Sequence, residues 1–162
     1  MGAFKVTGGG QLSGSIQPQG AKNEALQILC AVLLTPEPVT IHNIPNIIDV
    51  NKLIQILEKL GVKIEKHSNN DYTFQADNVN IDYLQSDNFK VDGRGLRGSI
   101  MIVGHLVTRF GKGFIPKPGG EKVGRSRLDT HCAGLSSMGA QVSYNKDESF
   151  AGVEALVVTG SA

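Results

Sequence analysis

The stretch PKPGGEKVGRSRLDTH, residues 116–131, gathers residue types that bind anions and can move protons. Two adjacent glycines precede a lone carboxylate, Glu121, and the same stretch contains four cationic side chains: Lys117, Lys122, Arg125 and Arg127. Cations at this density attract an anionic ligand. The carboxylate is then either a proton-transfer group or only the ion-pair partner of Lys122 or Arg125, and a solvated basic loop is the simplest alternative.

The charge of the whole chain supports a local anion site. The 162 residues carry a net charge of only +1, yet the segment 109–127 has a net charge of +5 and the rest of the chain −4. A basic patch on a near-neutral protein indicates a discrete anionic ligand rather than a long polyanion such as a nucleic acid. The six cations of this basic patch are Arg109, Lys112, Lys117, Lys122, Arg125 and Arg127.

Several other classes of protein fit the composition poorly. No apolar run approaches the roughly 18 residues of a membrane span, and the first ten residues lack the features of a signal peptide. Cys30 and Cys132 lie within helix-like patterns, so we expect two buried thiols, no disulfide and a reducing cytoplasm. The four histidines show no metal-ligand spacing, so no metal site is predicted.

Hydrophobic periodicity predicts the elements that position these residues. A first helix over 22–34 is apolar nearly all round after Gln27, and a strand follows over 39–44. A second helix begins at Asp49 as its N-cap and ends at Gly61, a left-handed C-terminal cap. Its apolar stripe is Val50, Leu53, Ile54, Leu57 and Leu60. A strand pair over 62–66 and 72–76 completes the unit.

The same order of elements returns in the second half. A helix over 96–111, a strand over 112–118, a helix over 127–139 and a strand over 140–145 follow one another. The face of the second of these helices holds Leu128, Cys132, Leu135 and Met138. LEKLGVKI, residues 57–64, is echoed by LSSMGAQV, residues 135–142, 78 residues later. Two copies of a helix–strand–helix–strand–strand unit are therefore predicted, followed by one more strand within 154–162.

The motifs GAKNEALQILCAVLL, LRGSIMIVGHLVTRFGKG and PGGEKVGRSRLDTHCAGLSSMGA resemble the UDP-N-acetylglucosamine enolpyruvyl transferases over about residues 4–150. The resemblance implies an α/β (α+β) fold of βαβαββ units in an inside-out barrel, with two of the usual six units present. It divides the chain into an N-terminal strand of the other lobe (1–20), a first unit (21–93), a second unit (94–153) with an active-site loop (112–127), and the start of a third (154–162).

The resemblance also implies an activity and its residues. The family transfers the enolpyruvyl group of phosphoenolpyruvate to the 3′-hydroxyl of UDP-N-acetylglucosamine, and the resemblance implies neither a metal nor an organic cofactor. Lys22 and Asn23 match its phosphoenolpyruvate-contacting pair, and a lysine at a helix start suits an anion site. Arg97 matches an arginine that contacts the UDP-sugar, where a guanidinium fits a diphosphate. Residues 125–130 match the segment around the uridine end: Arg125, Ser126, Arg127, Leu128, Asp129 and Thr130.

Glu121 takes the place of the family's loop acid, which is usually Cys and in some members Asp, and which protonates the methylene carbon of phosphoenolpyruvate. Nearby cations lower the pKa of a carboxyl group, so this role requires desolvation when the loop closes. Ser126 stands where the family has a phosphoenolpyruvate-binding arginine, and Arg127 where a proline is common. Either Arg125 or Arg127 is available to supply the missing charge.

Two other functions remain open at this point. A catalytically inert fragment that binds a nucleotide sugar is one, because the other lobe would hold further arginines and the base for the 3′-hydroxyl. We therefore expect the isolated chain not to turn over, and its uncovered edges to favour self-association. The sister family that makes 5-enolpyruvylshikimate 3-phosphate is the other, although its helix typically starts with SKS where this chain has AKN.

Overall fold

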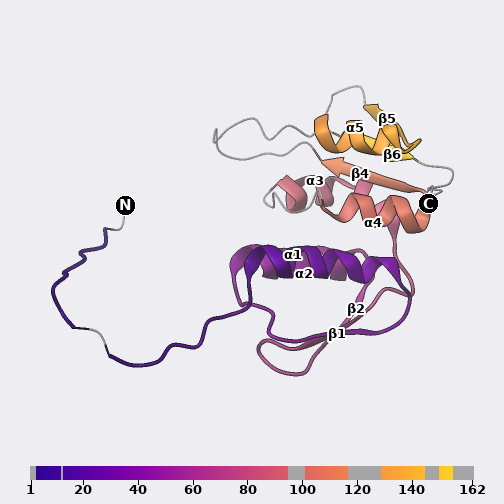
Figure 1. Cartoon of the computed structure of the whole chain (residues 1–162). Coiled ribbons are helices and arrows are strands. Elements are labelled where there is room, and N and C mark those ends of the chain that lie inside the picture. The colour runs from indigo at the N-terminus through magenta and orange to yellow at the C-terminus, as the bar shows by residue number, and fades with distance from the viewer. Residues whose placement is uncertain (1–2, 12, 95–100, 117–128, 145–149, 155–162) are drawn as a thin grey trace.

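The computed structural model describes residues 3–11, 13–94, 101–116, 129–144 and 150–154. The described residues form two units that repeat one order of elements, with the first unit below the second in Figure 1. The first unit contains α1 (Lys22–Ala31), η1 (Val32–Leu34), β1 (Val39–Ile41), α2 (Ile48–Lys59), β2 (Lys63–Lys66) and β3 (Tyr72–Gln75). The second contains α4 (Met101–Phe110), β4 (Lys112–Pro116), α5 (Asp129–Ser137), β5 (Gln141–Tyr144) and β6 (Phe150–Glu154).

The two sheets have the same topology. In the first, β3 lies between β1 and β2, and in the second, β6 lies between β4 and β5; all four pairings are antiparallel. Register places Phe74 opposite both Val39 and Ile64, so these apolar residues share the face of the sheet that packs on the core. The predicted duplication of a helix–strand–helix–strand–strand unit is thus confirmed in the described residues.

The echoed glycines have the same structural role. Gly61 and Gly139 adopt positive φ angles of 93° and 94°, and each follows the last turn of a helix. The amides of Gly61 and Val62 donate to the carbonyls of Glu58 and Leu57, and those of Gly139 and Ala140 donate to Ser136 and Leu135. Both ends are therefore Schellman motifs, in which only glycine adopts the left-handed conformation without strain.

Several predicted boundaries need correction. The helix over 22–34 is present, but its last turn is the 3₁₀ helix η1, and Ile28 and Leu34, in its apolar part, are exposed. The predicted strand 39–44 ends at Ile41, because Asn43 adopts a left-handed φ of 58° that breaks the extended backbone. Asp49 is not the N-cap of α2: Ile47 takes that position, and Asp49 lies in the first helical turn.

The helices of the second unit end close to where they were predicted. Gly111, at a φ of 73°, terminates α4 as expected. On α5, Cys132 is buried and Leu135 is partly buried, but Met138 is 58% exposed, so the predicted apolar face is incomplete; Leu128 lies outside the described residues. The predicted strand within 154–162 also lies outside them beyond Glu154, whereas β6 has no counterpart among the predicted strands.

The segment 81–94 contains two elements that the sequence analysis does not predict, η2 (Ile81–Gln85) and α3 (Asp87–Arg94). Ser86 caps α3, since its hydroxyl accepts a hydrogen bond from the Phe89 amide at 3.2 Å. The Asp92 carboxylate accepts from Lys59 Nζ of α2 at 2.7 Å and from the Tyr83 hydroxyl at 2.6 Å, and both interactions lower its pKa. These contacts fasten α3 to the first unit.

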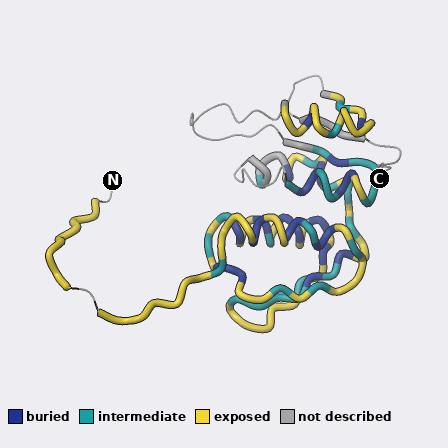
Figure 2. The backbone as a smooth tube through the Cα atoms, viewed as in Figure 1, coloured by how far each residue is buried: buried dark blue, intermediate teal, exposed yellow. Residues whose placement is uncertain are grey.

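One hydrophobic core joins the two units. Helices α1 and α2 lie side by side between the first sheet and α4, and their inward faces are buried (Figures 1 and 2). Ile102 and Leu106 of α4 belong to the same cluster as Leu29 and Leu33 of the first unit. The N-terminal residues 3–20 have no assigned strand in their described part and extend away from this body, with Phe4 and Ile16 exposed (Figure 2).

Candidate functional site

The structure places Lys22 and Asn23 together at the start of α1. Lys22 is the first helical residue, it follows Ala21 in an extended conformation, and no side chain caps the helix. Both residues are exposed. The free amide groups of a first helical turn and a nearby ammonium group both favour an anion, so this end of α1 can bind one.

Asp49 is the ion-pair partner of Lys22, and sequence reasoning missed this role. Its Oδ2 atom contacts Lys22 Nζ, and the side chains are 37% and 49% exposed, respectively. Asp49 lies in the first turn of α2, so the pair brings the starts of the two helices together. A carboxylate is favourable at a helix start and a lysine is unfavourable there, so Asp49 offsets the charge of Lys22 when no ligand is bound.

Gly20 fixes where α1 begins. A Cβ atom on this residue would lie 2.1 Å from the carbonyl oxygen of Asn43 and 3.2 Å from Cδ of Pro45. The chain before Lys22 therefore runs against the loop between β1 and α2, and only glycine allows that approach. Its position directly before the AKN motif is the sequence signal that could have identified it as a residue that positions the site.

Replacing Gly20 by alanine should displace the start of α1, because the contacting atom is a backbone oxygen that cannot rotate away. We expect a loss of about 1–3 kcal/mol in the free energy of unfolding, together with weaker anion binding at Lys22. Urea denaturation and a phosphate titration followed by NMR would measure the two effects. Gly8→Ala is the matched control, since a Cβ at Gly8 would meet nothing within 4 Å; equal stability of the two variants would contradict the prediction.

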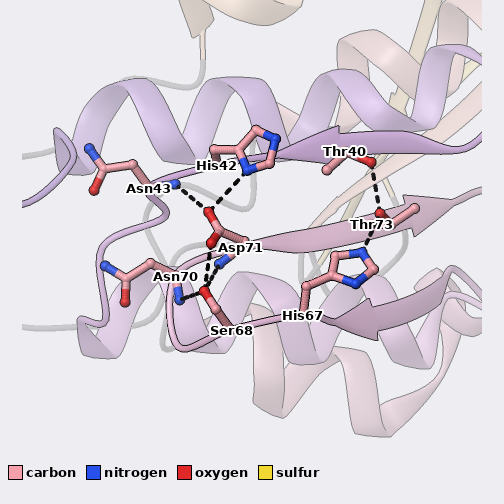
Figure 3. Close-up of polar contacts among 8 residues, drawn as sticks. All are labelled: Thr40, His42, Asn43, His67, Ser68, Asn70, Asp71 and Thr73. Atoms are coloured by element: carbon pink, nitrogen blue, oxygen red, sulfur yellow. Dashed lines mark hydrogen bonds and ion pairs between the residues drawn. The ribbon is translucent and has the colours of Figure 1, made fainter.

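The loop against which Gly20 packs is held by a polar cluster around Asp71 (Figure 3). Asp71 Oδ1 accepts from the Asn43 amide at 3.2 Å and lies 3.1 Å from His42 Nδ1, while Oδ2 accepts from the Ser68 hydroxyl at 2.6 Å. The Ser68 hydroxyl oxygen in turn accepts from the amides of Asn70 and Asp71. This cluster ties the β2–β3 turn to the end of β1, and so supports the carbonyl that contacts Gly20.

The hydrogen bond from Ser68, followed by those from Asn43 and His42, holds the pKa of Asp71 below its usual value. A lowered pKa in the folded state means that the cluster stabilises the protein fully above the unfolded-state pKa, near 3.9, and loses this contribution as the pH falls through the folded-state pKa. Asp71→Asn should therefore lower stability at pH 7, and the difference between the two proteins should narrow as the pH falls below about 4. Urea denaturation of both proteins between pH 7 and pH 3 tests this; a gap that does not narrow on acidification would contradict it.

The basic patch is only partly available for an anion. Arg109 Nη1 donates to the carbonyls of Leu33, Thr35 and Ala76 at 2.9, 3.1 and 2.9 Å, and is therefore a structural residue. Lys112 lies 3.8 Å from a carboxylate oxygen of Asp82. Arg109 was counted among the six cations of the basic patch, but its guanidinium group is committed to backbone oxygens.

The remaining predicted site residues fall mostly beyond the described part. Asp129 and Thr130 are the first two residues of α5, and Thr130 is exposed. The described residues bring together Lys22, Asn23 and Asp49, but they do not test the loop between β4 and α5. Six predicted residues lie outside them: Arg97, Glu121, Arg125, Ser126, Arg127 and Leu128.

The described residues contain no group of three or more His, Cys, Asp or Glu side chains placed to hold a metal ion. Within the same ranges, no helix has the length and apolar character needed to cross a membrane.

Cys30 and Cys132 are both unpaired and buried, as predicted. Burial raises the pKa of Cys30 to about 12, so this thiol is not a nucleophile.

Comparison with known proteins gives one consistent family. The family model of EPSP synthase (3-phosphoshikimate 1-carboxyvinyltransferase) matches residues 6–160. A UDP-N-acetylglucosamine 1-carboxyvinyltransferase of Bacteroides fragilis is 50% identical over 162 residues, and that of Porphyromonas gingivalis is 50% identical over 147. The enzyme of the same name from Cronobacter sakazakii is 40% identical over 142 residues.

The chain is shorter than these relatives. The match to the B. fragilis protein covers all of this chain but only 37% of that protein's length. The P. gingivalis match covers 91% of this chain and 34% of the relative, and the C. sakazakii match covers 88% of this chain and 32% of the relative. The crystal structure of the enolpyruvyl transferase NikO from Streptomyces tendae has the same fold over 92% of this chain and 31% of its own, with a TM-score of 0.66 at 20% identity. The chain belongs to the EPSP synthase family.

Proposed function

We propose that this chain forms the phosphoenolpyruvate-binding part, and a portion of the nucleotide-sugar site, of an enzyme that transfers the enolpyruvyl group to the 3′-hydroxyl of UDP-N-acetylglucosamine. This reaction releases phosphate and is the first committed step of peptidoglycan synthesis. The observation that carries the proposal is the GAKN motif at the exposed start of α1, where Lys22 and Asn23 are the first two helical residues. The 50% identity to enzymes of that name supports it.

Each residue has a chemical role in the proposal. Lys22, Asn23 and one of Arg125 or Arg127 bind the phosphate and carboxylate groups of phosphoenolpyruvate, and Arg97 binds the diphosphate of the UDP-sugar. Residues 125–130 hold the uridine end. Glu121 delivers a proton to the methylene carbon while the 3′-hydroxyl oxygen, losing its own proton to a base, bonds to the adjacent carbon. Loss of phosphate together with one proton of the new methyl group then restores the carbon–carbon double bond.

The same proposal covers the architecture. The two units are two of six βαβαββ units in a two-lobed inside-out barrel, with boundaries at residues 21–93 and 94–153. Residues 1–20 supply a strand to the other lobe, and 154–162 begin a third unit. Other units, or a second copy of the chain, cover large apolar side chains that the described part exposes, including Ile28, Leu34 and Ile48.

A chimera tests the activity. The 162 residues replace the matching segment of the B. fragilis relative, and phosphate release from phosphoenolpyruvate is measured after the intact mass has been verified. We expect release that depends on UDP-N-acetylglucosamine and does not occur with shikimate 3-phosphate, and we expect none from the 162-residue chain alone. A folded chimera that uses shikimate 3-phosphate, or that binds the UDP-sugar without any turnover, would contradict the proposal.

Resistance to fosfomycin is a specific consequence of Glu121. The drug alkylates the thiol that family members usually carry at this position, and a carboxylate there is a far weaker nucleophile. Neither Cys30 nor Cys132 replaces it, because both thiols are buried. Intact-mass spectrometry of the chimera treated with fosfomycin should show no adduct, whereas the matched variant Glu121→Cys should acquire one. A covalent adduct on Glu121 itself would contradict this prediction.

A further inference from the structure

Asp49 is the charged side chain that contacts Lys22, and the proposed function gives it no role. We propose that Asp49 is a built-in counter-ion that competes with the anionic ligand for Lys22, and so keeps the affinity of this site for free phosphate low. The inference rests on the proposed function in one respect: it takes Lys22 as the residue that binds the phosphate group. In this role Asp49 positions Lys22 and limits the binding of free phosphate, and it is not a catalytic residue.

The geometry makes the competition unavoidable. Asp49 Oδ2 contacts Lys22 Nζ directly, so an anion that approaches the same ammonium group comes well within one Debye length, about 8 Å, of the Asp49 carboxylate. Both side chains are partly exposed, which leaves the pair open to solvent and to a ligand. Glu24, also in the first turn of α1, adds a second negative charge to the same end of the helix.

The position of the pair is fixed by the fold. Gly20 packs against the Asn43 carbonyl, and Asn43 is held by Asp71, so the start of α1 cannot move far from the β1–α2 loop. Asp49 follows this loop in the first turn of α2. The two charges therefore remain neighbours whether or not a ligand is present, and Asp49 acts on every anion that Lys22 binds.

Removing the Asp49 carboxylate has two opposite effects on the affinity for phosphate. Asp49 orients Lys22, but a partly exposed ion pair contributes at most about fivefold to an equilibrium constant. Asp49 also repels a phosphate dianion, and a unit charge at contact distances near a protein surface changes affinity by about tenfold or more. Repulsion is therefore the larger effect, and Asp49→Asn should bind phosphate more tightly than the unaltered chain does.

The repulsion between Asp49 and phosphate affects product release in the proposed reaction. Inorganic phosphate is a product, and a site with only cations would retain it after each turnover. Asp49 favours release of the product, because its carboxylate compensates the charge of the Lys22 ammonium group once phosphate has left. The substrate has contacts outside this site that free phosphate lacks, so it can bind in spite of the repulsion, whereas free phosphate depends on this site alone.

A titration of the 162-residue chain with inorganic phosphate, followed by ¹H–¹⁵N NMR of the amides at the start of α1, tests the inference. We expect Asp49→Asn to bind phosphate about tenfold more tightly, and Asp49→Glu, which keeps the charge, to resemble the unaltered chain. In the background of Lys22→Met the competition for the ammonium group is absent, so Asp49→Asn should have a smaller effect there, and the part of the effect that disappears measures that competition.

The outcomes separate this inference from the proposed function. Phosphate binding that requires Lys22 but is unchanged or weakened by Asp49→Asn would overturn the inference and leave the proposed anion site intact. Binding that is the same in the unaltered chain and in Lys22→Met, or no binding at all, would overturn both. Amide spectra of the variants without phosphate establish that each is folded.

Discussion

Replacing Lys22 by methionine in the chimera should reduce kcat/KM for phosphoenolpyruvate by about 100- to 1000-fold, the range found when one preorganised electrostatic group is removed from a catalytic site. Methionine keeps an unbranched, flexible side chain and favours helix, so the change removes the charge and leaves α1 intact. The ammonium group lies at an exposed helix start. Its loss therefore removes an interaction with ligand charge rather than an interaction of the core.

Stability measurements distinguish this result from unfolding. The Lys22–Asp49 pair is partly exposed, and such pairs contribute at most about 1 kcal/mol to the free energy of unfolding. Lys22→Met should therefore unfold at nearly the same urea concentration as the unaltered protein. Lys52→Met, at an exposed position on α2, is the matched control and should keep full activity. Activity of Lys22→Met within tenfold of the control would exclude Lys22 from the proposed mechanism.

The repeated helix ends illustrate what local sequence can predict. Gly61 and Gly139 each follow an apolar helix and precede a strand, and their left-handed conformations depend on the backbone of a single turn. Information of that kind is contained in about six consecutive residues. The helices α1, α2, α4 and α5 and the internal duplication were therefore predictable, whereas η2, α3 and β6 were not.

Features that depend on contacts between distant segments were not predictable in the same way. Asp49 resembles an ordinary N-cap in sequence, and its pairing with Lys22 appears only when the two helix starts are brought together. Arg109 was assigned to an anion-binding patch because it adds to the local positive charge. Its true partners are carbonyl groups 33 to 76 residues away in the chain, which no local pattern reveals.

Arg109 is also the residue whose loss should destabilise the fold most among the polar residues described. Its Nη1 atom has two hydrogens and lies within hydrogen-bonding distance of three carbonyl oxygens, so at least one hydrogen is shared. These oxygens belong to the middle residue of η1, the residue after η1 and the residue after β3. The guanidinium group of Arg109, in the second unit, thereby satisfies three backbone carbonyl groups of the first unit. The guanidinium carbon also lies 4.8 Å from the centre of the Phe110 ring.

We expect Arg109→Ala to lower the free energy of unfolding by about 2–4 kcal/mol, since charge-assisted hydrogen bonds are lost and partly buried carbonyls are left without their donor. Arg109→Lys should lose less, because one ammonium group keeps the charge and can reach some of the acceptors. Urea denaturation measures both variants. Lys63→Ala is the matched control: Lys63 forms an exposed ion pair with Asp77, and its removal should cost less than about 1 kcal/mol.

Hydrogen exchange locates the effect and separates it from a general loss of stability. Because Arg109 links α4 to η1 and β3, its removal should raise exchange at the contacts between the units, including the amides of α4, before it does so at the Schellman motif around Gly61. A variant as stable as Lys63→Ala, or one in which all amides lose protection together, would mean that the buried cluster of Leu29, Leu33, Ile102 and Leu106 holds the units together without Arg109.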